Sequence, residues 1–220
     1  MSKKSSKIGI FDSGLGGLTV LKSIKQKYPN EKFIYVGDTA FLPYGSKTAE
    51  TIIQRTHKIV QFLIKKNVKG IIVACNSASS VALKSLKNEY STPILGVIES
   101  SIKLALKNKE VKTIGLLGTS TTVNSKAYES KLLSYSNEVK LFSTACPLFV
   151  PLVEEGWINK NTNIISSIAK EYIKILFQKN KKIDSIILGC THYPILLKQI
   201  KYAISSLGYN ADRLFFIDNG

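Results

Sequence analysis

The stretch Ile71-Ile-Val-Ala-Cys-Asn76 returns in altered form as Ile186-Ile-Leu-Gly-Cys-Thr191. A second pair of similar stretches precedes these two, Ile8-Gly-Ile-Phe-Asp-Ser13 and Ile114-Gly-Leu-Leu-Gly-Thr119. The first pair is offset by 115 positions and the second by 106, which is close enough for one ancestral unit with a small insertion. We therefore predict two similar halves that face each other, with the two cysteines at equivalent positions.

Short apolar runs alternate with longer amphipathic segments along the whole chain. This alternation is typical of βαβ units and of a largely parallel sheet. The clearest helix is predicted over Ala49–Asn67, with Ser46 or Thr48 as its N-cap, and another over about Asn163–Lys179. We predict strands at Ile8–Phe11, Phe33–Val36, Gly70–Ala74, Ile94–Val97, Ile114–Leu117, Val139–Ser143, Ser185–Leu188 and Leu214–Ile217.

The composition is that of a soluble globular protein, with 220 residues, 44% hydrophobic and 21% charged. The N-terminal apolar run, Ile8 to Phe11, is too short for a secretory signal, and no segment approaches a membrane span. We therefore expect a cytoplasmic protein. The three cysteines are widely spaced and form no CxxC pair, which argues against a disulfide scaffold and against a metal site of the zinc-ribbon type.

The formal net charge of +16 raises the question of nucleic-acid binding. Of the 31 basic residues only Arg55 and Arg213 are arginine, so the bidentate fork favoured for base and phosphate recognition is nearly absent. The lysines are scattered and lack interleaved aromatic residues. We interpret them as a solvated surface without specific nucleic-acid binding, whose positive field helps to attract an anionic substrate.

Cys75 and Cys190 each end a hydrophobic strand and precede a predicted helix. Ligands of open α/β sheets bind at the carboxyl ends of strands, so both sulfurs should lie in the crevice between the halves. A helix N-terminus beside a thiol favours the thiolate. The alternative is that both are small buried hydrophobic residues, because free cysteine is often buried. Their equivalence in the repeat favours a function for the pair.

Other residues near these strand ends carry groups suited to chemistry. His192 lies two residues after Cys190 and is the histidine expected to act in acid/base chemistry, whereas His57 lies within a helix and is assigned a solvated or packing role. The glycine-rich Asp12–Gly17 lacks the full dinucleotide pattern, but its backbone N–H groups could hold a carboxylate. Pro43–Gly45 is predicted to form a rigid binding turn.

In order along the chain, these motifs resemble the glutamate racemase family. The resemblance runs from residue 8 to the last residue. The matching stretches are Asp12-Ser-Gly-Leu-Gly-Gly17, Pro43-Tyr-Gly45, Ala74-Cys-Asn-Ser-Ala-Ser79, Gly118-Thr119 with Thr122, Cys146-Pro-Leu-Phe-Val-Pro-Leu-Val-Glu154 and Leu188-Gly-Cys-Thr-His-Tyr-Pro194. Single motifs are moderately specific, and the ordered set is strong.

The resemblance implies catalytic roles for Cys75, Cys190, Asp12, Glu154 and His192. Asp12 would assist on the Cys75 side, and Glu154 with His192 on the Cys190 side. It also implies that no pyridoxal phosphate, metal or other cofactor takes part. The substrate-binding positions that it implies are Asp12, Ser13, Pro43, Tyr44, Gly45, Asn76, Ser77, Thr119, Thr191 and His192.

The implied activity is interconversion of L- and D-glutamate, the latter a precursor of peptidoglycan. The Cys75 position would act on D-glutamate and the Cys190 position on L-glutamate. The implied fold is α/β, with two pseudo-symmetric three-layer domains, largely parallel sheets and the active site in the crevice between them. We expect the first domain to comprise residues 1–98 and 210–220 and the second residues 99–209. The resemblance also allows a homodimer.

Two departures from the family pattern carry expectations of their own. Ser77 stands where the family usually has threonine, and because the hydroxyl is kept we expect little change. Family members usually continue beyond the Asp-Ser/Pro-Gly that matches Asp218-Asn-Gly220, with a helical segment that packs on the first domain. We therefore expect an apolar face of that domain to lie uncovered, with consequences for activity and stability.

Three other functions stay open on the sequence. The nearest is a related two-cysteine racemase for aspartate or for both acidic amino acids. A second is a cysteine hydrolase that uses Cys190 with His192, which would form an acyl-enzyme and have no need of Cys75. A third is a non-enzymatic binding protein, with DNA binding that is lost at moderate salt.

Overall fold

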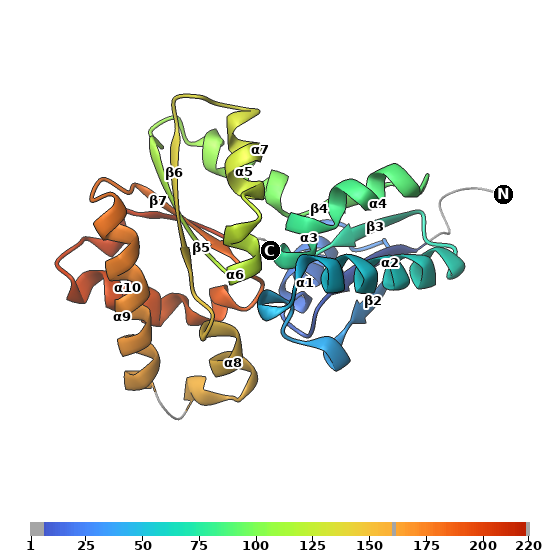
Figure 1. Cartoon of the computed structure of the whole chain (residues 1–220), viewed down its shortest axis with the longest axis horizontal. Helices are drawn as coiled ribbons and strands as arrows, with labels where there is room; N and C mark the ends of the chain where they lie inside the picture. The colour runs from blue at the N-terminus through green and yellow to red at the C-terminus, as the bar shows by residue number, and fades with distance from the viewer. Residues whose placement is uncertain (1–6, 160–161, 219–220) are drawn as a thin grey trace.

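The computed structural model describes residues 7–159 and 162–218, and their strands form two four-stranded sheets (Figure 1). Every strand pair is parallel, and all eight predicted strands are present. The first sheet has the order β2-β1-β3-β4, with β1 Ile8–Asp12, β2 Phe33–Gly37, β3 Gly70–Val73 and β4 Ile94–Gly96. The second has the order β6-β5-β7-β8, with β5 Thr113–Gly118, β6 Lys140–Ala145, β7 Ser185–Gly189 and β8 Phe215–Ile217.

The two sheets share one strand order, so β1 to β4 correspond in turn to β5 to β8. β3 pairs with β1 just as β7 pairs with β5. Cys75 follows β3 and Cys190 follows β7, so the two cysteines stand at equivalent strand ends. The repeat predicted from the sequence is therefore present in the fold.

The C-terminal strand belongs to the second half. β8 pairs with β7, from Ser185↔Phe215 to Ile187↔Ile217. Our assignment of residues 210–220 to the first domain was therefore wrong as far as residue 218, and residues 219–220 lie outside the described residues. The physical reason is that β8 takes the place beside β7 that β4 takes beside β3, which buries Ile217 in the core with Ile98.

In the first half, helices cover the two faces of the sheet unequally. One face carries α2, Ala49–Lys65, with α3, Asn76–Val81, and α4, Leu83–Glu89, and the other carries α1, Leu18–Lys27. The α2 helix buries one stripe of apolar side chains, and the Thr48 hydroxyl caps it by accepting a hydrogen bond from the N–H of Thr51 at 3.2 Å. It ends two residues before the predicted limit, because Asn67 adopts the left-handed conformation.

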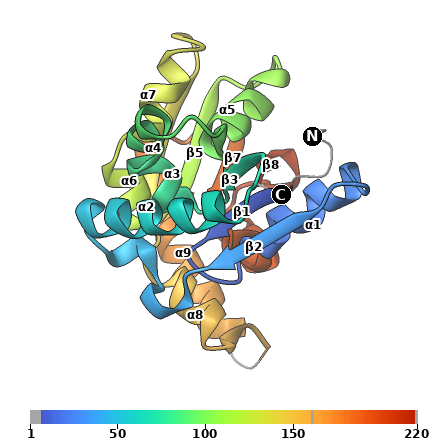
Figure 2. The ribbon, with the colours of Figure 1, turned by 90° about the vertical axis from the view of Figure 1, so that its right-hand side faces the viewer.

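In the second half, both faces of the sheet are well covered (Figures 1 and 2). The helices α9, Thr162–Lys179, and α10, Leu197–Ser206, pack together on one face, where they bury Ile186 and Leu188 of β7. Ile187 points to the opposite face. The helices of this half are α5 Ile98–Lys107, α6 Ser120–Asn124, α7 Ala127–Leu133, α8 Phe149–Glu154, α9 Thr162–Lys179 and α10 Leu197–Ser206. The predicted helix near residues 163–179 is thus confirmed as α9.

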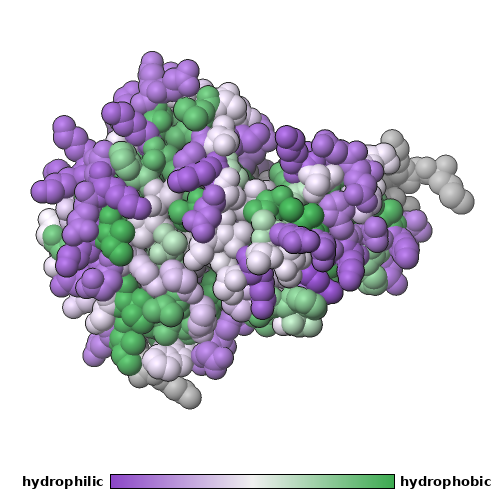
Figure 3. All heavy atoms as spheres, in the orientation of Figure 1, coloured by the Kyte–Doolittle hydropathy of each residue, from purple (hydrophilic) through white to green (hydrophobic). Residues whose placement is uncertain are grey.

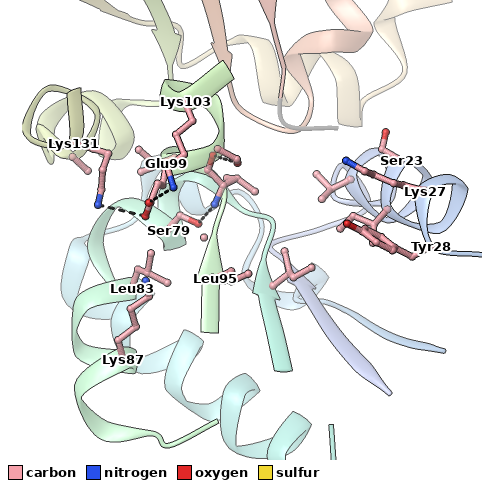
Figure 4. A pocket seen from close by; sticks show the side chains of 18 residues that line it. Ser23, Lys27, Tyr28, Ser79, Leu83, Lys87, Leu95, Glu99, Lys103 and Lys131 are labelled. Atoms are coloured by element: carbon pink, nitrogen blue, oxygen red, sulfur yellow. Dashed lines mark hydrogen bonds and ion pairs between the residues drawn. The ribbon is translucent and has the colours of Figure 1, made fainter. Parts of the chain in front are cut away.

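An open groove runs over the α1 face of the first sheet (Figure 4). Tyr28, which follows α1, lies on one side, Leu83 of α4 and Lys103 of α5 lie on the other, and Leu95 of β4 forms part of the floor. Leu95 is 61% exposed, which is unusual for an apolar residue in an inner layer.

Hydrophilic residues cover most of the face shown in Figure 3, over both halves, with hydrophobic patches between them. Among the described residues, no helix is both long and apolar enough to cross a bilayer.

Candidate active site

A small cavity lies where the two halves meet, at the carboxyl ends of β1, β3, β5 and β7. It is lined by Ser13, Pro43, Tyr44, Gly45, Cys75, Asn76, Ser77, Thr119, Val150, Cys190, Thr191 and His192. Every residue expected to bind or act on the substrate lines it except Asp12 and Glu154, which stand directly behind. Val150 was not foreseen. Parallel strand ends are the usual binding place in open α/β sheets.

The two thiols enter this cavity from opposite halves. Cys75 is the N-cap residue of α3, and Cys190 precedes a short 3-10 turn, Tyr193–Leu196. They are 5% and 7% exposed, and both line the cavity. Both thiols are free, with no disulfide. A planar carbon held between them would be accessible to one sulfur on each face.

Burial, and not the helix N-terminus, dominates the acidity of the two thiols. Burial, followed by the charge of Asp12, raises the pKa of Cys75 to about 12, and the backbone hydrogen bond from Ala78 only partly opposes this. Burial likewise raises the pKa of Cys190, against an opposing hydrogen bond from the backbone of His192. Our expectation that the helix starts favour the thiolates was therefore wrong, because desolvation outweighs the local dipoles.

Cys190 stands at the end of a chain of polar groups that leads to the surface. Its sulfur lies 3.7 Å from Nδ1 of His192, and Nε2 of the same ring is in a short hydrogen bond with Oε1 of Glu154. His192 is buried, whereas the Glu154 side chain on α8 is 29% exposed. The histidine can therefore move protons between the Cys190 side of the cavity and the outside.

Asp12, the last residue of β1, is fully buried behind the cavity. Its Oδ2 accepts a hydrogen bond from the N–H of Gly14 at 3.1 Å, and its Oδ1 accepts one from the Thr191 hydroxyl at 3.4 Å. Burial raises the pKa of this carboxyl, although those hydrogen bonds and the nearby His192 oppose the shift. An Asp with a raised pKa beside a thiol can exchange a proton with it.

The glycine-rich loop after Asp12 lets the two halves come close together. A Cβ on Gly16 would stand 2.5 Å from the Thr191 hydroxyl and 2.8 Å from the ring of His192. A Cβ on Gly17 would stand 2.5 Å from the Cβ of Asp12. These contacts are too short for any side chain, so the loop contributes close approach across the cavity.

Hydroxyl groups join the halves on the opposite side of the cavity. The Ser77 hydroxyl lies 2.9 Å from that of Thr119, which also caps α6 through the N–H of Thr122 at 3.2 Å. The Thr121 hydroxyl is a donor to backbone carbonyls of the first half, with Gly45 at 3.2 Å and Lys47 at 3.1 Å. The turn that contains Pro43 and Tyr44 is therefore held by the second half.

The similarity of the chain to known proteins agrees with this geometry. The Asp/Glu/Hydantoin racemase family model matches residues 8–207. The chain belongs to this family. Among curated members, it is 48% identical to glutamate racemase from Hydrogenobaculum sp. strain Y04AAS1 over 195 residues, which cover 89% of this chain and 73% of the relative. Glutamate racemase from Aquifex aeolicus is also 48% identical, with 89% and 74% covered.

Solved structures of family members have the same fold. A glutamate racemase isoform from Bacillus anthracis superposes with a TM-score of 0.90 at 33% identity, covering 98% of this chain and 77% of that one. Glutamate racemase from Francisella tularensis, solved with D-glutamate, has a TM-score of 0.86 at 35% identity, covering 98% and 76%. Aspartate racemase from Picrophilus torridus, at 18% identity and a TM-score of 0.60, shares the fold, with 97% and 89% covered.

Two residues behind the cavity were not foreseen from the family motifs. The Tyr44 hydroxyl donates a hydrogen bond of 2.6 Å to Asp38, and Arg55 donates two to the same carboxylate, at 2.7 and 3.0 Å. Burial opposes ionisation of Asp38, but these hydrogen bonds prevail and lower its pKa. The sequence held only weak indications of this role. Asp38 directly follows β2, and Arg55 is one of only two arginines.

Asn76 and Tyr128 form a further pair that the motifs do not link. Asn76 lines the cavity from the first half, and its Oδ1 accepts a hydrogen bond of 2.6 Å from the Tyr128 hydroxyl of the second half. The Nδ2 of Asn76 is buried and has no partner among the described residues. Tyr128 gave no signal in the sequence as a site residue.

The other histidine lies away from the cavity. His57 is in contact with the Tyr90 hydroxyl at 3.2 Å and the Ser85 hydroxyl at 3.1 Å, on the outer side of the first half. This agrees with the packing role expected for it. Within residues 7–159 and 162–218, no three His, Cys, Asp or Glu side chains are grouped as metal ligands would be.

Proposed function

We propose that this chain interconverts L- and D-glutamate by two-base proton transfer at Cα, with Cys75 and Cys190 as the two bases and no cofactor. The observation that carries the proposal is the pair of buried thiols at equivalent strand ends of opposite halves, facing one cavity. The product D-glutamate would serve peptidoglycan synthesis. The similarity to glutamate racemases supports the choice of substrate.

Racemisation requires removal of the α-proton from one face of the carbon and delivery of a proton to the other. One thiolate takes the proton and becomes a thiol, while the opposite thiol gives its proton and becomes the thiolate. By family resemblance, Cys75 is the base toward D-glutamate and Cys190 the base toward L-glutamate. The raised pKa of each thiol suits the role, because a desolvated thiolate is a stronger base than an exposed one.

Each thiol has a distinct group that can restore its protonation state. The charge of Asp12 acts on both thiols, as the second cause of the raised pKa of Cys75 and a lesser one for Cys190, and the His192–Glu154 pair contacts Cys190. Since the two thiols exchange roles in every turnover, the site needs a proton route on each side. The different neighbours give each direction of the reaction its own acid and base.

The lining of the cavity is suited to an anionic substrate through neutral donors. Among the described residues that line it, none is lysine or arginine. Hydroxyl groups of Ser13, Ser77 and Thr191, the Asn76 amide and backbone N–H groups at the strand ends would bind the two carboxylates. Donors fixed in this way also stabilise the charge that develops on the α-carboxylate as the proton leaves.

The test is incubation with L-glutamate in D₂O, followed by mass spectrometry and chiral separation. The D-enantiomer should carry deuterium at Cα from the first turnovers, because its proton comes from a thiol that exchanges with solvent. Cys75→Ser and Cys190→Ser should each abolish racemisation. Cys146→Ala, which removes a buried thiol outside the cavity, serves as control. Full racemisation by either serine variant would refute the two-thiol mechanism.

The same assay with L-aspartate decides between the two acidic substrates, and we expect glutamate to be preferred. A cysteine hydrolase is the second candidate, because Cys190, His192 and Glu154 form a nucleophile, base and acid in series. It would show a burst of acyl-enzyme with ester substrates and no effect of Cys75→Ser. Deuterium incorporation that requires both thiols would exclude it.

The proposed activity places the protein in the cytoplasm, where precursors of the cell wall are made. Its partner in this proposal is the small-molecule substrate. The homodimer allowed by the family resemblance stays a prediction, which light scattering coupled to size exclusion would check.

A further inference from the structure

The amide of Asn76 is divided between two environments. Asn76 is 2% exposed and begins α3 at the edge of the cavity. Its Oδ1 accepts the hydrogen bond from Tyr128, whereas its buried Nδ2 has no partner among the described residues. A buried N–H group without a partner is unfavourable, so it marks a place where a ligand oxygen would bind.

Tyr128 is well placed to fix which end of this amide faces the cavity. It is fully buried on α7, packed in the core of the second half with Leu132 and Ile187. Burial raises its pKa well above the ordinary value, so the phenol keeps the proton that it donates. It donates this proton to Oδ1, the acceptor of the amide, at 2.6 Å, which leaves the NH₂ group on the other side.

We propose that Tyr128 is a positioning residue that holds the Asn76 amide with its NH₂ group toward the cavity, where it binds a carboxylate oxygen of the substrate. This rests on the proposed function, since it assumes glutamate as the ligand. A rotated amide would turn Oδ1 toward the carboxylate and repel it. The hydrogen bond crosses from one half to the other, so this donor is in place only when the halves are together.

The first experiment measures kcat and KM of Tyr128→Phe with both enantiomers of glutamate. We expect KM to rise about 3- to 10-fold, the effect of one neutral hydrogen bond, with kcat changed by less than about twofold. The control is Tyr172→Phe, which removes another phenol of the second half, one that accepts from the N–H of Leu148 at 3.2 Å outside the cavity. This control should leave KM unchanged.

A double-mutant cycle separates positioning from a general structural effect. In the Asn76→Ala background there is no amide to orient, so Tyr128→Phe should raise KM no further. If Tyr128→Phe raises KM by the same factor in both backgrounds, or lowers kcat with KM unchanged, the proposal is overturned. Absence of racemisation in the wild type would instead refute the proposed function itself.

A measurement on the wild-type protein covers the case in which Tyr128→Phe fails to fold. In ¹⁵N-labelled protein, the side-chain NH₂ resonances of Asn76, assigned by their loss in Asn76→Ala, should shift when D-glutamate is added. Oδ1 accepts the hydrogen bond from Tyr128 and gives no ¹⁵N–H resonance of its own. Unchanged NH₂ resonances at a saturating concentration of D-glutamate would overturn the proposal.

Discussion

Arg55 holds the carboxylate of Asp38 with two hydrogen bonds, from Nε at 3.0 Å and from Nη2 at 2.7 Å. Asp38 in turn accepts a hydrogen bond from the hydroxyl of Tyr44, a fully buried residue of the cavity wall. The arginine also lies over the ring of Phe41, 3.8 Å from its centroid. A surface arginine on α2 is thus connected through one carboxylate to the binding turn.

We predict that Arg55→Ala lowers the free energy of unfolding by about 2 kcal/mol, because it leaves a buried carboxylate without its charged donor. KM should rise as the Tyr44 turn loosens, with a smaller change in kcat. Arg55→Lys keeps the charge but not the fork, and should recover only part of either loss. Urea unfolding and steady-state kinetics measure the two effects. Unchanged stability in Arg55→Ala would contradict this account.

The lowered pKa of Asp38 adds a pH dependence to this prediction. The folded state holds the ionised form more strongly than the unfolded chain does. Its stabilising contribution is therefore complete above the ordinary Asp pKa near 3.9 and is lost as the pH falls through the lowered value. In acid unfolding at pH 2–5, the difference between wild type and Arg55→Ala should shrink toward the acid end.

Gly16→Ala should inactivate the protein without unfolding it. Its Cβ would stand 2.5 Å from the Thr191 hydroxyl, so the loop and the second half must move apart. A misplacement of about 1 Å between reacting groups costs about 100-fold in rate, and we expect kcat/KM to fall by at least that factor. Gly70→Ala is the matched control, because its Cβ would stand 3.4 Å from the nearest atom. Equal activity of the two variants would refute this interpretation.

Asp12→Asn is expected to stabilise the fold while it reduces racemisation. Burial raises the pKa of Asp12, so above its ordinary pKa this carboxyl destabilises the folded state relative to the unfolded chain. Asparagine does not ionise, and it should raise the free energy of unfolding by about 1 kcal/mol. Because the folded pKa is raised, the gain over wild type should be small near pH 4 and grow as the pH increases. Chemical denaturation at several pH values measures the difference in the free energy of unfolding between Asp12→Asn and wild type.

The Cys75 thiol predicts a loss of stability in alkali. Its pKa is about 12 in the folded protein against an ordinary value near 9.0, so the folded state keeps a proton that the unfolded chain releases. The titration of this thiol leaves the free energy of unfolding unchanged below pH 9. Above pH 9 it lowers that free energy by about 1.4 kcal/mol per pH unit. Wild type should therefore lose stability relative to Cys75→Ser between pH 9 and pH 10.5. Parallel curves for the two proteins would show that the thiol is not desolvated.

Much of the fold was predictable because apolar runs mark buried parallel strands. We assigned Leu214–Ile217 to the wrong half, although the repeat contained the answer, since this run occupies the position of Ile94–Val97 in the other half. The raised pKa of Cys190 could not be read from the chain, because desolvation depends on what the opposite half covers. Tyr128 was missed because its role depends on a contact with Asn76, 52 positions away in sequence.

The different surroundings of Cys75 and Cys190 can affect the kinetics only within a thermodynamic limit. Two enantiomers have the same free energy in water, so at equilibrium they are present in equal amounts. The values of kcat/KM in the two directions must then be equal, however different the neighbours of Cys75 and Cys190 are. The unequal surroundings of the thiols can change kcat and KM for each enantiomer. Any ratio of kcat between the two enantiomers must then equal the ratio of their KM values. Progress curves started from either side would therefore end at the same racemic mixture, along paths of different shape.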